Sequence, residues 1–230
     1  MSVVAELVLI RHGQSTANVA FPRADVDGLL ESGVTGRDTD VELTELGVCQ
    51  AEAIGRWLGG LATDRLPQVA ITSPYLRARE TWRIAAVASG RDLPEPTTDD
   101  RLVDRLLGDL EMLTRAAIAK RFPDEPGRLA VAGEYYYRPP GGESFDDIAE
   151  RITSFLNDIN GAHVGQRVAV VAHDAVVLTM RAVIEQLDWD AVAAVAAAGP
   201  VRNASITRFD GSSGRLVLDG YNTVDHLPTR

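Results

Sequence analysis

Short apolar runs alternate with longer stretches of mixed polarity along this chain. Runs of four or five apolar residues are too short for helices and are typical of buried strands. They occupy residues 6–10, 69–72 and 168–172. Two further β-like runs, 204–209 and 215–218, flank a turn with glycine at both ends and predict a hairpin.

The stretches between the strands have the periodicity of helices with one buried face. The predicted helices span residues 43–58, 73–87, 113–121, 144–159, 174–185 and 189–198. Thr44 is placed to cap the first, Ser73 with Pro74 to open the second, and Ser144 with Asp147 to form a capping box. Strands that alternate with helices predict an α/β fold, a three-layer α/β/α sandwich around a mostly parallel sheet.

Composition narrows the class of protein. A chain of 230 residues that is 45% hydrophobic favours one domain, residues 1–230. The net charge of −10 argues against a nucleic-acid or anionic-membrane partner. Cys49 is the single cysteine, which excludes an internal disulfide and fits a reducing compartment. Without a signal-like or membrane-spanning stretch, the expected location is the cytoplasm.

Two of the predicted strands end in histidine, at His12 and His173. Ligands of α/β proteins bind at the carboxyl edge of the sheet, so both imidazoles are candidates for chemistry. Arg11 directly precedes the first histidine, and a guanidinium fork suits two oxygens of a phosphate. Ser15 and Asn18 can supply further hydrogen bonds. A neutral imidazole in such a loop can attack phosphorus and form a phosphohistidine.

Five segments carry a resemblance to a known family. In chain order they are residues 11–15 (RHGQS), 35–47 (TGRDTDVELTELG), 73–81 (SPYLRARET), 140–144 (PGGES) and 170–173 (VVAH). Together they resemble the signature segments of the histidine phosphatase superfamily, also called the phosphoglycerate mutase-like family. The resemblance runs from about residue 6 to residue 210, and it implies a phosphoglycerate mutase-like fold.

The resemblance also implies roles for individual residues. His12 would be the phosphorylated nucleophile, and Arg11, Arg77 and His173 would hold the transferred phosphoryl group. Ser15 and Asn18, joined by Thr35 and Gly36 of the segment that resembles the family's phosphate loop, are predicted to bind substrate. No metal is expected, because arginines and the second histidine neutralise the phosphoryl charge.

The proton donor is predicted with alternatives. The family places a carboxylate in an L-x-E-x-x-x-G pattern, which residues 102–108 match with Asp104 in place of glutamate. Asp104 would protonate the leaving oxygen and then activate water. Asp109 and Glu111 are rivals. Asp174, where the family more often has glycine, is a second candidate donor, a helix cap or a residue that orients the neighbouring histidine.

The expected reaction is hydrolysis of a small phosphomonoester without a cofactor. The segment that could cover the site is short, and its cations are Arg115, Lys120, Arg121, Arg128 and Arg138. The family's mutases carry a longer and more basic insert, and residues 135–137 (YYY) offer an aromatic wall instead. A phosphoglycerate mutase primed by 2,3-bisphosphoglycerate is the alternative, and a non-catalytic phospholigand-binding protein the third reading. The oligomeric state stays open, a homodimer included.

Overall fold

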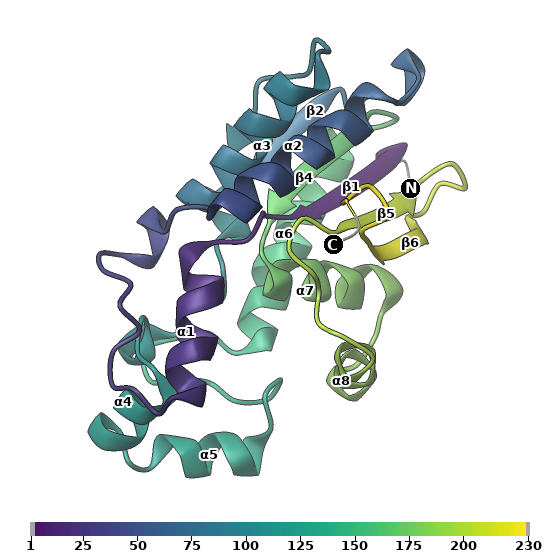
Figure 1. Ribbon diagram of the computed structural model, residues 1–230. Helices are drawn as coiled ribbons and strands as arrows, with labels where there is room; N and C mark the ends of the chain where they lie inside the picture. Colours follow the sequence, from purple (N-terminus) through teal and green to yellow (C-terminus); the bar gives the residue numbers. More distant parts are fainter. Residues whose placement is uncertain (1–2, 229–230) are drawn as a thin grey trace.

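Six strands form one mixed sheet in the order β3-β2-β4-β1-β5-β6 (Figure 1). The structure is a computed structural model that describes residues 3–228. The strands are β1 (Glu6–Arg11), β2 (Val69–Thr72), β3 (Thr97–Thr98), β4 (Arg167–Ala172), β5 (Ile206–Asp210) and β6 (Val217–Thr223). β3, β2, β4 and β1 are parallel, whereas β5 pairs antiparallel with both β1 and β6. The predicted strands and hairpin are confirmed, and only the two-residue β3 was not foreseen.

The sheet is accompanied by eight α-helices in the described residues. They are α1 (Thr16–Val26), α2 (Glu45–Gly59), α3 (Leu76–Ser89), α4 (Arg115–Arg121), α5 (Glu125–Ala132), α6 (Phe145–Ala162), α7 (Asp174–Glu185) and α8 (Trp189–Ala197). All but α1 and α5 were predicted. α1 carries Pro22 inside it and buries only Ala24, so it lacks the apolar stripe that marks a helix in sequence.

Two of the three helix caps predicted from the sequence are present in the structure. The Thr44 side chain accepts a hydrogen bond from the Gly47 amide at 3.1 Å, and Ser144 and Asp147 form the expected capping box. The prediction for Ser73 is wrong. α3 begins three residues later, after Tyr75, because the Ser73 hydroxyl turns to His173 instead.

Two apolar cores lie on opposite faces of the sheet because its central strands alternate their side chains between the two sides. Val8 and Ile10 of β1 pack toward α2 and α3, where Trp82 is almost fully buried. Leu7 and Leu9 pack toward α6 and α7, around Phe155. Figure 1 shows these helix pairs on opposite sides of the sheet, which confirms the three-layer architecture.

The carboxyl ends of the central strands provide the place for a site. α1, α3 and α7 each begin within a few residues of the ends of β1, β2 and β4. α1, α4 and α5 lie together beyond this edge (Figure 1), where the Asp25 side chain accepts a hydrogen bond from the amide of Arg115. Three helix N-termini therefore face the same region, which favours an anion there. Among residues 3–228, no helix is long and apolar enough to cross a bilayer.

Candidate active site

The loop after β1 fixes the position of His12. The His12 amide donates to the Ala172 carbonyl at 3.0 Å, which joins the ends of β1 and β4. The next residue, Gly13, lies against Gly47 at the start of α2. A Cβ at Gly13 would lie 2.5 Å from the Gly47 carbonyl oxygen, and a Cβ at Gly47 would lie 2.0 Å from that of Gln14. Both glycines are therefore needed to hold this loop against α2.

The His12 ring is held as a neutral nucleophile. Its Nδ1 lies 2.7 Å from the Gly13 carbonyl oxygen, which can only accept, so the proton sits on Nδ1 and the lone pair on Nε2. The ring is 2% exposed. Burial lowers the pKa of His12 well below 6.5, and the positive charges of Arg77 and Arg11 lower it further. Nε2 is thus unprotonated, and its lone pair is free to attack an electrophile.

His173 lies beside His12, with 5.2 Å between the ring centroids. Its Nε2 lies 2.8 Å from the Ser73 hydroxyl, which already accepts from the amide of Tyr75 and so can donate to the ring. The proton of His173 is then on Nδ1. That atom lies 3.3 Å from an Asp104 oxygen, yet it has no hydrogen-bond partner among residues 3–228.

The second histidine is neutral in this environment. Burial, followed by the charges of Arg77 and Arg11, lowers the pKa of His173 well below 6.5. Neutralisation of phosphoryl charge by this histidine, as expected from the sequence, would require a cationic ring. Its surroundings disfavour that charge, so we expect it to act as a buried N–H donor.

Arg77 occupies the first turn of α3, as predicted, and its guanidinium group is buried. Nη1 donates to the Asp38 side chain at 2.9 Å and Nη2 to Asp38 and Asp104 at 3.1 Å each. The Tyr75 ring packs against it at 4.9 Å. Sequence reasoning missed Asp38 and Tyr75, although both lie inside segments that carry the family resemblance.

Arg11 is held by the residue that follows the second histidine. Its Nη2 lies 3.2 Å from an Asp174 oxygen, and its Nη1 donates to the Val201 carbonyl. Its buried Nε has no hydrogen-bond partner within the described part of the chain. Asp174 therefore orients Arg11, and no hydrogen bond or ion pair joins its side chain to His173 among residues 3–228.

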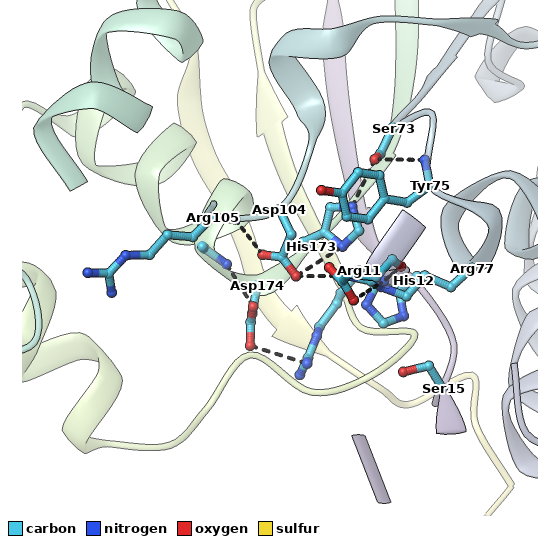
Figure 2. A network of polar contacts seen from close by, with 12 residues as sticks. Arg11, His12, Ser15, Ser73, Tyr75, Arg77, Asp104, Arg105, His173 and Asp174 are labelled. Atoms are coloured by element: carbon cyan, nitrogen blue, oxygen red, sulfur yellow. Dashed lines mark hydrogen bonds and ion pairs between the residues drawn. The ribbon is translucent and has the colours of Figure 1, made fainter. Parts of the chain in front are cut away.

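Asp104, the predicted proton donor, lies on the cavity wall. It lines the same cavity as His12, and its Oδ1 accepts a hydrogen bond from the Arg105 amide at 2.9 Å. Figure 2 shows the Asp104 carboxylate beside Arg77 and His173, both of which approach the same oxygen, Oδ2. Its rival Glu111 also lines the cavity, whereas Asp109 is not among the lining residues.

The predicted substrate-binding residues divide into two pairs. Ser15 and Asn18 line the cavity, and together they form the capping box of α1. The Asn18 Oδ1 atom accepts from Ser15 and Asn203, while its Nδ2 donates to no protein atom in the described chain. Thr35 and Gly36 are exposed and do not line the cavity, so the structure gives no support to their predicted role. The loop that carries them brings Asp38 to the site instead.

The cavity around these residues has a volume of about 690 Å³. Its apolar wall consists of Ala17, Phe21, Pro22, Leu107, Met112, Leu113, Tyr135, Phe145, Ala175 and Leu178. Of the predicted aromatic wall, Tyr135 lines the cavity, Tyr136 is exposed and Tyr137 is buried against Glu125. No three His, Cys, Asp or Glu side chains within residues 3–228 are grouped to hold a metal ion.

The basic residues considered for a mutase are not at the cavity. Arg115, Lys120, Arg121, Arg128 and Arg138 are all absent from its lining. Arg115 pairs with Asp25 and Arg128 with Glu125 at the surface. The segment from α4 to α5 therefore adds no second anion site to the cavity.

Comparison with known proteins identifies the family. The family model of the histidine phosphatase superfamily (branch 1) matches residues 7–224. This chain belongs to that superfamily. The predicted family and fold are thereby confirmed.

Proteins named as phosphatases and proteins named as phosphoglycerate mutases are both similar to this chain. The chain is 30% identical over 226 residues to a metal-independent phosphoserine phosphatase of Arabidopsis thaliana, a match that covers 98% of this chain and 84% of that protein. It is 35% identical over 186 residues to a 2,3-bisphosphoglycerate-dependent phosphoglycerate mutase of Methylocella silvestris, covering 79% and 81%. The solved structure of a mycobacterial glucosyl-3-phosphoglycerate phosphatase superimposes with a TM-score of 0.73 at 29% identity, covering 96% and 99%.

Proposed function

We propose that this protein hydrolyses a phosphomonoester through a phosphohistidine at His12. The observation that carries the proposal is a buried, neutral His12 beside two buried N–H groups that have no hydrogen-bond partner among residues 3–228, Arg11 Nε and His173 Nδ1. A buried donor without a partner costs stability, so its presence in a cavity indicates a ligand that accepts from it. A phosphoryl group has the oxygens to do so.

The first step transfers the phosphoryl group to the enzyme. His12 Nε2 attacks phosphorus in line, and the bond from phosphorus to the ester oxygen breaks with its electron pair on that oxygen. Asp104, protonated in the substrate complex, gives its proton to this oxygen, and the alcohol leaves. The Gly13 carbonyl stabilises the charge that develops on the imidazole, because it accepts from the ring's other nitrogen at 2.7 Å.

The second step returns the enzyme to its starting state. Asp104 takes a proton from water, and the water oxygen bonds to phosphorus while the bond to His12 Nε2 breaks. Its electron pair returns to the ring nitrogen, and inorganic phosphate leaves. A single carboxyl group thus serves as acid and then as base. Its place between Arg77 and His173 lets it reach both the leaving oxygen and the attacking water.

The charge of the transferred group is balanced by side chains on three elements. Arg11 ends β1, Arg77 lies in the first turn of α3, and His173 directly precedes α7. Two guanidinium groups and one N–H donor therefore surround the equatorial oxygens, with the N-termini of α1 and α7 nearby. Such preorganised donors stabilise the transition state without a change in their own geometry.

The positions of the basic residues favour hydrolysis over mutase activity. A mutase must hold a second acidic group of its substrate, and the basic residues of α4 and α5 do not reach the cavity. Phosphoglycerate mutase activity remains the second candidate because similar proteins carry that name.

The experiment combines a hydrolysis assay with chemical trapping. Turnover of p-nitrophenyl phosphate should release inorganic phosphate, and a radiolabelled phosphoryl group should appear on the protein as an acid-labile, base-stable adduct. His12→Ala should abolish both, whereas His163→Ala, which alters a histidine outside the cavity, should abolish neither. A labelled His12→Ala protein would refute the proposed nucleophile. Mutase turnover of 3-phosphoglycerate with the bisphosphate primer, with little hydrolysis, would favour the second candidate.

A further inference from the structure

The charges on the cavity wall indicate what kind of alcohol the phosphate is attached to. The phosphoryl end of the cavity is marked by His12, Arg11 and Arg77 on its wall, so the remainder of the wall faces the organic part of the substrate. That remainder is acidic and apolar. Five carboxylates line the cavity, namely Asp38, Asp104, Glu111, Glu134 and Asp174, against three guanidinium groups, those of Arg11, Arg77 and Arg105.

Each of the three arginines is engaged by the protein itself. Arg11 pairs with Asp174, and Arg77 pairs with Asp38 and Asp104. Arg105, the guanidinium group on the cavity wall outside the phosphoryl site, donates to the Glu134 carboxylate at 2.7 Å and to two backbone carbonyls. Figure 2 shows its side chain directed away from His12 and Arg77. A second acidic group on the substrate would find no free cation in the cavity.

One carboxylate is left over after these pairs are formed. Asp104 is needed as the proton donor, and Glu111 has neither a hydrogen bond nor an ion pair from its side chain among residues 3–228. Burial and the nearby charge of Asp38 raise the pKa of Glu111, while the charges of Arg37 and Arg77 lower it. Neither arginine forms an ion pair with this carboxylate among residues 3–228, so a cationic group in the cavity would supply a direct partner.

Aromatic and aliphatic side chains complete this part of the wall. Phe21, Leu107 and Leu113 line it with Tyr135 and Phe145, whose rings lie 4.8 Å apart. The Arg105 guanidinium group already lies over the Phe145 ring at 4.8 Å, so these apolar side chains serve to accommodate a hydrocarbon linker.

We propose that the substrate is the phosphate monoester of an amino alcohol, with an ammonium group that meets Glu111 and no second acidic group. This inference rests on the proposed hydrolysis at His12. It separates the chain from proteins that act on phosphates bearing a carboxylate.

The test compares three matched series of substrates. The phosphate esters of ω-amino alcohols, unbranched alcohols and ω-hydroxy acids, each with two to six carbons, differ only in the charge at the far end. We expect the best amino ester to exceed its uncharged counterpart in kcat/KM by about fivefold, the effect of one partly exposed ion pair. The carboxylate esters should be the poorest substrates, because they meet Glu111 without a cation.

Two substitutions at one position connect the preference to its cause. Glu111→Gln should bring the ratio of amino to alkyl ester to about one, and Glu111→Lys should reverse it in favour of the carboxylate ester. Glu95→Gln removes the same charge from an exposed residue that does not line the cavity, and it should leave the ratio at about fivefold.

The outcomes distinguish this inference from the proposed function. If p-nitrophenyl phosphate is hydrolysed and the protein is labelled, but amino and alkyl esters are equal or the carboxylate ester is best, the amino-alcohol inference is overturned and the hydrolysis stands. If Glu111→Gln leaves the preference intact, Glu111 is not its cause. Absence of both label and hydrolysis would overturn the proposed function itself.

Discussion

Replacement of Asp104 by asparagine tests the proton transfer most directly. The amide keeps the size of the carboxyl group, and Oδ1 can still accept from the Arg105 amide at 2.9 Å. It can neither give a proton to the leaving oxygen nor take one from water. General acid catalysis is worth roughly 10²- to 10⁴-fold, or about 3 to 5 kcal/mol of activation free energy. An alkoxide needs this proton, whereas p-nitrophenolate is stable without it.

Asp104→Asn should therefore affect the two steps differently. For alkyl phosphates, kcat/KM reports the first step, and we expect it to fall about 10²- to 10⁴-fold. For p-nitrophenyl phosphate it should fall less than about tenfold, while kcat falls further because the second step has lost its base. Rapid mixing should show a burst of p-nitrophenolate close to the enzyme concentration, followed by slow turnover. The phosphohistidine should accumulate and be recovered after an alkaline quench, in which its P–N bond is stable.

The matched control is Asp109→Asn, the same change at a residue that does not line the cavity. It should leave kcat/KM for both classes of ester within about twofold and show no burst. Equal loss for esters with good and poor leaving groups would refute the acid role of Asp104. A burst in the Asp109 variant would assign the second step to that residue instead.

Three further predictions follow from the geometry of the site. Gly13→Ala places a Cβ 2.5 Å from the Gly47 carbonyl oxygen, so it should cost about 1 to 3 kcal/mol of unfolding free energy and lower kcat/KM about 100-fold; an unchanged melting temperature would contradict this packing. Asp174→Asn removes the ion pair between Asp174, whose side chain is 45% exposed, and Arg11, and it should lower kcat/KM two- to fivefold at unchanged melting temperature. If the only effect were a shift of the acid limb of the pH profile, Asp174 would be a proton donor instead. His12 and His173 are neutral when buried and protonate more readily when unfolded, so stability should be full above pH 6.5 and fall as pH drops below it, by about 1.4 kcal/mol per pH unit for each ring. Urea denaturation at pH 7.5 and 5.5 should show this loss reduced in His12→Gln; an equal loss in both proteins would mean that the ring titrates alike in the folded and unfolded states.

Local patterns in the sequence were sufficient for most of the elements. β2 and α7 have the predicted boundaries because apolar runs and polar breaks define them without help from distant residues. Thr44 and Ser144 cap their helices, since each bonds to an amide three residues along the chain. α1 was missed because it buries only Ala24 and carries Pro22. Its position depends on the Ser15 cap and on contacts with α4.

The sequence by itself placed His12 and His173 at strand ends and, through the family resemblance, predicted Asp104 and Arg77 at the site. Only the tertiary structure decided which charges meet there. Asp174 pairs with Arg11 and, within the described part of the chain, forms no hydrogen bond or ion pair with the adjacent histidine. Asp38 holds Arg77, and the basic residues of α4 and α5 lie outside the cavity. Hydrogen bonds within a helix turn are set by spacing, whereas an ion pair between distant residues depends on the packing of whole elements. Strands, helices and caps therefore depend mainly on the local sequence, whereas the electrostatic balance of the cavity depends on the tertiary structure.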